Sequence, residues 1–221
     1  MPFPRIGCKT TRARHRSRLV RYMIATLTIL GSALVGIAPT ATAFPAKHHR
    51  RHHRARSASA CAGANASVRS APTSVLRNAV VCLINQDRAQ HHLPALQAAA
   101  QLDSSAQGWT NVMVSSDQFT HGSNFAARIS AAGFVWRAAG ENIATGYSTP
   151  RGVVRAWMAS TGHCQNILNP TYRSVGTGVS VRPVKGWASG AGTWTQDFAL
   201  GMSQSAPSGN TGPMDGCPYT G

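Results

Sequence analysis

The sequence predicts an α+β domain whose sheet is covered by helices on both faces. Apolar residues first recur at helical spacing, over residues 74–133. An extended segment at 134–147 and one more helical segment come next, before strand patterns at 174–184 and 192–201. Helices first, then strands with a helix inserted between them, are typical of α+β domains. A region of roughly 160 residues is long enough to bury one core.

Two long helices and one short helix are predicted in the first half of the domain. The first begins at Ser74 and ends in polar residues 85–88, and its expected face consists of Val75, Ala79, Cys82, Leu83 and Gln86. Pro94 separates it from the next helix, because proline lacks an amide hydrogen and keeps its preceding residue out of helical angles. The second helix starts near Leu96, and its expected face consists of Leu102, Ala106, Trp109, Val112 and Met113. A short third helix is stopped by Gly133.

The second half alternates extended segments with one helix. Residues 134–147 have the aromatic and β-branched content of a strand. Pro150 suits the first turn of a helix through 151–161, which we expect Gly162 to close. A compact turn at 166–172 leads into the last two strands. In the first of these strands, the alternating residues are Val175, Thr177, Val179 and Val181.

Residues 1–43 are predicted to be a secretory signal peptide. A basic head precedes an apolar run, and Ala41-Thr42-Ala43 forms a small-residue cleavage site before Phe44. A retained membrane anchor is the alternative, because the apolar run is close to the minimum that spans a bilayer. We therefore expect the mature protein to be secreted, extracellular or associated with the cell envelope.

Three regions follow from this division: the signal peptide, a disordered His/Arg-rich basic leader at 44–60, and a domain at 61–221 with its core at about 73–200 and a tail at 201–221. Of 22 Lys and Arg residues, only ten lie in the domain, against six acidic residues. The leader can contact anionic surfaces, or it is simply a solvated linker. Because the charge is not concentrated on the domain, no nucleic-acid partner is expected.

Four cysteines remain after the signal peptide, which suits an oxidising compartment. They permit three pairings, of which we expect Cys61–Cys82 and Cys164–Cys217. Loops of about 20 and about 50 residues would each contribute about 3 to 4 kcal/mol by chain entropy. Free thiols for a metal or for catalysis are disfavoured, because no Cys-x-x-Cys spacing exists.

Three residues are candidates for chemistry: His121 in QFTHGS, Glu141 in GENIA, and His163 in STGHCQNIL. Each lies beside a glycine at the end of a predicted element, where side chains often carry function. Glu141 is also the only glutamate in the chain. For each residue taken alone, a capping or solvated role is the simpler interpretation.

Six motifs occur in a characteristic order: LINQDRAQHHLPAL, FTH, AGENIATG, VVRAWMASTGHCQNILNP, VGTGV and WTQDFA. In this order they resemble the bacterial form of the CAP superfamily, the SCP-like extracellular domain of cysteine-rich secretory proteins, antigen 5 and pathogenesis-related proteins. The resemblance covers roughly Thr73 to Leu200. It implies a three-layer α-β-α sandwich with a central antiparallel sheet. It also implies a shallow cleft, lined by two histidines and acidic residues, that can hold a divalent cation.

The chain departs from the animal and plant pattern at two cleft positions. Ser160 stands where those proteins have a Glu after W-x-x, and Thr193 stands where they have a His. The bacterial form is similar to this chain in supplying its second His from the end of a helix. The cleft and metal candidates are therefore His121, Glu141, His163 and Asp197.

Two imidazoles with a carboxylate suit a divalent ion such as zinc, and magnesium is the second candidate. Without a metal, the same groups could act as a general base and an electrostatic stabiliser. No serine lies in a G-x-S-x-G turn, which disfavours a nucleophilic hydrolase.

The leading hypothesis is an extracellular binding or interaction module at the cell envelope, whose ligand is a lipid, an envelope polymer or another extracellular molecule. The alternatives are a lipid- or sterol-binding protein and a metal-assisted, peptidase-like hydrolase that uses His121, Glu141 and His163. Fold alone does not choose between them, and non-enzymatic function is favoured.

Overall fold

The computed structural model of the chain describes residues 61–206 and 216–218. The predicted signal peptide and basic leader lie outside these residues, as do 207–215 and 219–221 of the predicted tail. Within the described part, no helix combines the length and the apolar character needed to cross a bilayer.

A four-stranded sheet forms the middle layer, in the order β1 (Gln97–Ala98), β3 (Ser174–Ser180), β4 (Thr193–Gly201) and β2 (Trp136–Thr145). The long strands pair antiparallel, and the short β1 pairs parallel with β3. β4 is therefore central, and β2 is an edge strand.

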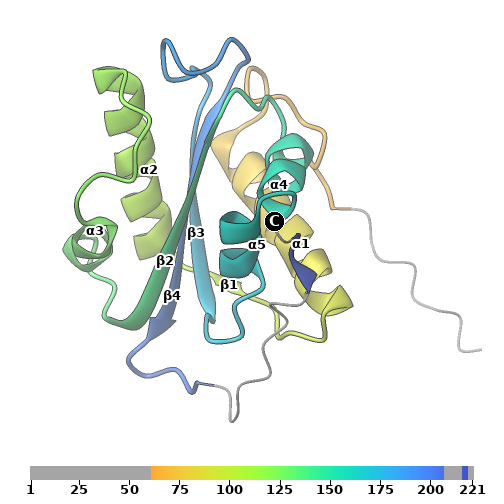
Figure 1. The fold of residues 1–221 in the computed structure, drawn as a ribbon, viewed down its shortest axis with the longest axis vertical. Helices are drawn as coiled ribbons and strands as arrows, with labels where there is room; N and C mark the ends of the chain where they lie inside the picture. Colours follow the sequence, from red (N-terminus) through yellow and green to blue (C-terminus); the bar gives the residue numbers. More distant parts are fainter. Residues whose placement is uncertain (1–60, 207–215, 219–221) are drawn as a thin grey trace, which may run out of the picture. The chain divides into compact units, whose positions relative to one another are not determined.

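Helices cover both faces of this sheet (Figure 1). On one face lie α2 (Ala100–Ser116) and α3 (Phe125–Ala131). On the other lie α1 (Thr73–Gln90), α4 (Pro150–Met158) and α5 (Thr161–Ile167). The predicted three-layer α-β-α sandwich is confirmed.

Two glycines of the VGTGV motif let α2 lie directly on the sheet. A Cβ atom at Gly176 would be 2.1 Å from the carbonyl carbon of Leu102, and one at Gly178 would be 2.3 Å from the carbonyl oxygen of Ala106. Any side chain there would therefore push the helix away. Between them, the Thr177 amide donates to the Asp103 carboxylate at 2.7 Å, which fixes the helix along the strand.

The predicted helix faces are partly wrong. The buried face of α1 includes Leu76, Val80 and Ile84, whereas Val75 is exposed. The shift arises because α1 packs against both α4 and β3. On α2, Val112 is exposed and Thr110 is buried.

Two predicted boundaries also differ. The chain is extended from Leu96, because the Asn85 side chain bonds both the amide and the carbonyl of Leu96, at 2.8 and 2.9 Å. Residues 97 and 98 then pair with β3 before α2 begins. Gly162 does not close a helix: α4 ends at Met158, Ser160 is extended, and α5 starts at Thr161.

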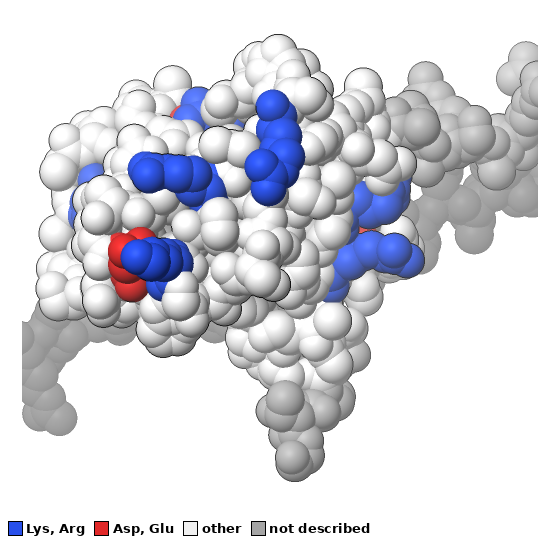
Figure 2. Space-filling model, turned by 90° about the horizontal axis from the view of Figure 1, so that it is seen from above, with Lys and Arg blue, Asp and Glu red and all other residues white. Residues whose placement is uncertain are grey.

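The face of the domain in Figure 2 carries its Lys and Arg side chains as separate groups with neutral surface between them. This distribution agrees with the modest excess of ten basic over six acidic residues from Cys61 onward.

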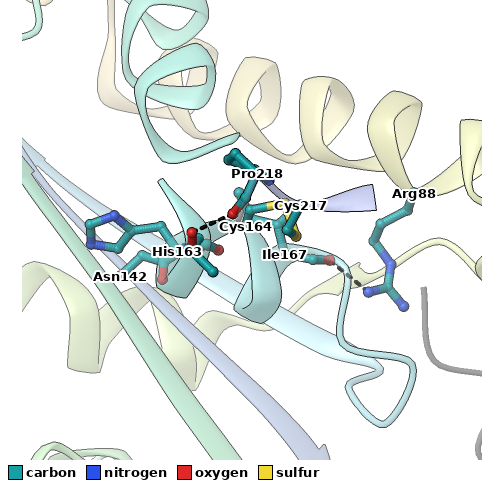
Figure 3. The surroundings of a disulfide bond; sticks show 8 residues. Arg88, Asn142, His163, Cys164, Ile167, Cys217 and Pro218 are labelled. Atoms are coloured by element: carbon teal, nitrogen blue, oxygen red, sulfur yellow. Dashed lines mark hydrogen bonds between the residues drawn. A yellow bond between two sulfur atoms is a disulfide. The ribbon is translucent and has the colours of Figure 1, made fainter. Parts of the chain in front are cut away.

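Both predicted disulfides are present, Cys61–Cys82 and Cys164–Cys217. The first joins the start of the described chain to α1, and the second joins the C-terminal segment to α5 (Figure 3). The Thr161 hydroxyl also donates to the Pro218 carbonyl. The C-terminal segment is thus held against α5 by a covalent and a polar contact.

The guanidinium of Arg88, near the end of α1, is fully buried and donates to carbonyl groups of several segments (Figure 3). The acceptors, at 2.8 to 3.4 Å, are Pro94, Ile167, Asn169 and Tyr172. Burial, and to a smaller extent the nearby Arg173, lowers the pKa of Arg88 to about 10, so that it still carries its charge at neutral pH. The polar residues 85–88 were predicted to cap the helix, but Arg88 instead points into the core.

We expect Arg88→Lys to lower the free energy of unfolding by about 2 to 4 kcal/mol, because an ammonium group cannot reach all four carbonyls and each unpaired buried carbonyl costs about 1 to 3 kcal/mol. Urea unfolding measures this change. The matched control is Arg151→Lys, at an exposed residue that bonds Asn65, with an expected change within about 0.5 kcal/mol. Equal losses in the two variants would contradict a central role for Arg88.

Candidate functional site

Glu141 lies within the edge strand β2, and its two neighbours in the GENIA stretch serve the opposite face of the sheet. A Cβ atom at Gly140 would be 2.5 Å from the Tyr172 hydroxyl, so only glycine fits there. The buried Asn142 side chain donates to the His163 carbonyl at 3.1 Å. Figure 3 shows Asn142 beside His163. The flanking residues thus anchor the strand to α5, while Glu141 faces α2 and α3.

Both carboxylate oxygens of Glu141 have close partners. Oε1 lies 2.8 Å from Nδ1 of His121, and Oε2 accepts from Nη2 of Arg128 at 2.5 Å. The Glu141 side chain is 1% exposed, whereas that of His121 is 48% exposed. Because the carboxylate can only accept, Nδ1 of His121 is the donor, and in the neutral ring Nε2 is left as an acceptor.

Arg128 is held by three neighbours. In addition to its ion pair with Glu141, Nη1 donates to the His121 carbonyl at 3.1 Å. Its guanidinium carbon lies 3.9 Å from the ring centroid of Trp109, a cation–π distance. The indole of Trp109 is itself fixed by donating to the Thr120 carbonyl at 2.9 Å. The loop before α3, α2 and β2 therefore converge on this one side chain.

Asp197 lies directly opposite Glu141 on β4 and is 1% exposed. Neither of its carboxyl oxygens has a hydrogen-bond partner within the described part of the chain. Burial is the main reason that the pKa of Asp197 is raised to about 8; the nearby Ser105 hydroxyl and Arg128 lower it, and Glu141 raises it. Asp197 is therefore mainly protonated at neutral pH, which suits a buried carboxyl group beside a second carboxyl group.

His163 lies in the first turn of α5. Burial lowers its pKa, and the positive charge that His121 can acquire lowers it further. The imidazole of His163 is thus neutral at neutral pH. The electrostatic effect also means that the two histidines lie within reach of each other's charge.

A groove of about 370 Å³ is lined by the end of β2, by α4 and by the start of α5. Phe119, Tyr147 and Trp187 contribute aromatic rings to it, and His163 and Ser160 contribute polar groups. The rings of Phe119 and Trp187 pack with centroids 5.6 Å apart. Trp187 is 58% exposed and Tyr147 is 37% exposed, so much aromatic surface faces solvent.

The structure brings the predicted site residues together only in part. His121 contacts Glu141, Asp197 lies across from Glu141, and His163 lines the groove. Arg128 was missed by the sequence analysis. One signal was available: Arg128 and Arg137 are the only Lys or Arg residues between Arg88 and the sole glutamate.

These residues do not fit a divalent cation held by Glu141. Within residues 61–206 and 216–218, no three His, Cys, Asp or Glu side chains gather as a set of metal ligands. The carboxylate of Glu141 already accepts from an imidazole and a guanidinium. The predicted zinc or magnesium ion stays a prediction, which depends on the guanidinium moving away.

Residues 81–198 match the sequence model of the cysteine-rich secretory protein family, known as CAP. The chain belongs to the CAP family. It is 38% identical over 136 residues to the uncharacterized protein YkwD of Bacillus subtilis, covering 58% of this chain and 49% of that protein. The CAP domain is thus of the bacterial kind that the sequence motifs indicated.

Two bacterial proteins of solved structure match part of this chain. An extracellular protein with an SCP domain from Bacillus anthracis is 25% identical, with a TM-score of 0.50, over 58% of this chain and 44% of its own. An outer surface protein of Borrelia burgdorferi is 18% identical, with a TM-score of 0.49, over 55% of this chain and 90% of its own. The chain spans about half the length of the curated relative. It is a CAP domain protein, and the Bacillus anthracis protein that it resembles is described as extracellular.

We expect Asp197→Asn to remove a pH dependence of stability. The pKa of Asp197 in the folded domain, about 8, lies above its ordinary value of 3.8. Stability from this group is therefore fully present below about pH 4 and is lost as the pH rises to about 8. The difference in unfolding free energy, wild type minus variant, should fall by at most about 1.4 kcal/mol per pH unit in that window. Urea unfolding from pH 4 to pH 8 measures it, and a constant difference would contradict the raised pKa.

Proposed function

We propose that this CAP domain is an extracellular binding module at the cell envelope, and that its ligand binds in the groove beside β2. The observation that carries this proposal is the exposure of Trp187 and Tyr147 at a concave site. Exposed aromatic rings around a cavity are typical of recognition sites, because they offer a large apolar area at little entropy cost.

The size and lining of the groove limit the ligand. A volume of about 370 Å³ is near the lower end for small-molecule sites, so one ring or one short chain segment fits. His163 and Ser160 supply polar groups at the same site. A repeating polymer of the cell envelope, which presents both apolar faces and polar groups, suits this lining.

Binding is favoured over catalysis because the acidic residues are already engaged. Glu141 has a partner on each oxygen, and Asp197 is buried and mainly protonated at neutral pH. Neither is therefore available as a general base for a ligand in the groove. The metal-assisted hydrolase needs an open coordination position, which this arrangement of Glu141 does not offer.

A lipid or sterol ligand is the second candidate function. It is favoured by the apolar part of the lining, which includes Phe119, Ile143 and Trp157. The basic leader at 44–60 lies outside the described residues, so its contact with anionic surfaces, like the alternative of a solvated linker, stays a prediction. Both binding modes can be measured with one set of variants.

We expect Trp187→Ala to reduce binding to purified peptidoglycan at least fivefold, about 1 kcal/mol, as for an aromatic anchor. Co-sedimentation of the full chain, at a salt concentration that screens the leader, measures the bound fraction. Met202→Ala is the matched control, because Met202 is 57% exposed and lies outside the groove.

Phosphatidylcholine vesicles are tested in parallel. Binding to vesicles alone, lost in Trp187→Ala, would replace the polymer by a lipid as the ligand. Peptidoglycan binding that is equal in wild type and Trp187→Ala would contradict the groove as the site.

A further inference from the structure

The charge of Glu141 is balanced from inside the domain. A buried carboxylate needs a positive partner, because its desolvation is otherwise costly. The CAP resemblance implies a cleft that can hold a divalent cation, and Glu141 is one of its candidate ligands. Here the guanidinium of Arg128 lies against Oε2 of Glu141 at 2.5 Å.

The position of Arg128 is built into the fold. The Asn124 side chain accepts from the Ala127 amide at 2.9 Å and so sets the start of α3, one turn before Arg128. Gly122 has a φ of 68°, and a Cβ atom there would lie 2.8 Å from the Trp109 ring. Only glycine therefore lets this loop close over the indole on which the guanidinium rests.

A metal ion and this guanidinium would compete for the same carboxylate. Zinc binds carboxylate oxygens at about 2.0 to 2.2 Å, well inside the hydrogen-bonding distance of the guanidinium. An ion on Oε2 would meet a fixed positive charge, and Oε1 already accepts from His121. The Glu141 side chain is 1% exposed and the Arg128 side chain is 21% exposed, so little room is left for hydrated ions.

We propose that Arg128 is a built-in cation of this CAP domain: its guanidinium occupies the place beside Glu141 that a divalent cation would take. The domain then needs no metal to orient His121, because the Arg128–Glu141 pair already fixes that ring. Arg128 thus positions Glu141 and His121 and has no direct contact with a ligand in this proposal. The inference does not depend on the ligand proposed for the groove.

Zinc uptake by the full chain at pH 7 tests the proposal. The His-rich leader will bind zinc, so each protein is compared with its own Glu141→Gln counterpart, in which leader binding is unchanged. Wild type should bind no more zinc ions per chain than Glu141→Gln does. Arg128→Met keeps the length of the side chain and removes its charge. Arg128→Met should therefore bind about one zinc ion per chain more than the double variant Arg128→Met/Glu141→Gln does, since the freed carboxylate of Glu141 becomes a ligand.

Two results would overturn the inference. One is a zinc ion in wild type that Glu141→Gln removes, and the other is a folded Arg128→Met that gains no ion. Should Arg128→Met fail to fold, NMR of the wild type decides. The Trp109 indole signal and the Arg128 Nε–H signal should not move between zinc and a chelator, and movement of both would show that an ion displaces the guanidinium.

Discussion

The buried guanidinium of Arg88 joins parts of the chain that no strand pairing connects. It links the end of α1 to the loop after it and to the turn between α5 and β3. That turn fixes where α5 ends, and α5 carries His163 and the cysteine that holds the C-terminal segment. The position of α5, which lines one side of the groove, therefore depends on the buried guanidinium of Arg88. A buried charge is tolerated where its donors find acceptors, and four carbonyl groups accept from the Arg88 guanidinium.

β2 contacts both helical layers, because its neighbouring side chains point to opposite faces of the sheet. Glu141 points to α2 and α3, where it meets His121 and Arg128, and Asn142 points to α5. Because successive residues of a strand face opposite sides, a single G-E-N sequence can serve both layers. The sole glutamate of the chain thus supplies a carboxylate on one face of β2. On the other face, the Asn142 amide fixes the strand to α5.

Features governed by local chemistry could be predicted from the sequence. Pro150 and Gly133 indicated helix ends, alternation indicated β3, and the even cysteine count indicated two bridges. The contact of His121 with Glu141 followed from the family resemblance. Arg88 and Arg128 could not be predicted in this way. An arginine near a helix end is usually solvated, and only the packing of distant segments brings it carbonyl or carboxylate partners. The two-residue β1 was missed for the same reason, because Asn85 imposes it from another helix.

The tether between Cys217 and α5 has a practical consequence for anyone who labels this protein. Pro218 lies against Thr161, two residues from His163. A label fused directly after Pro218 would lie next to the helix that lines the groove. Such a fusion would crowd the site under study. At the other end of the described chain, the first disulfide joins Cys61 to α1, and none of residues 61–90 lines the groove.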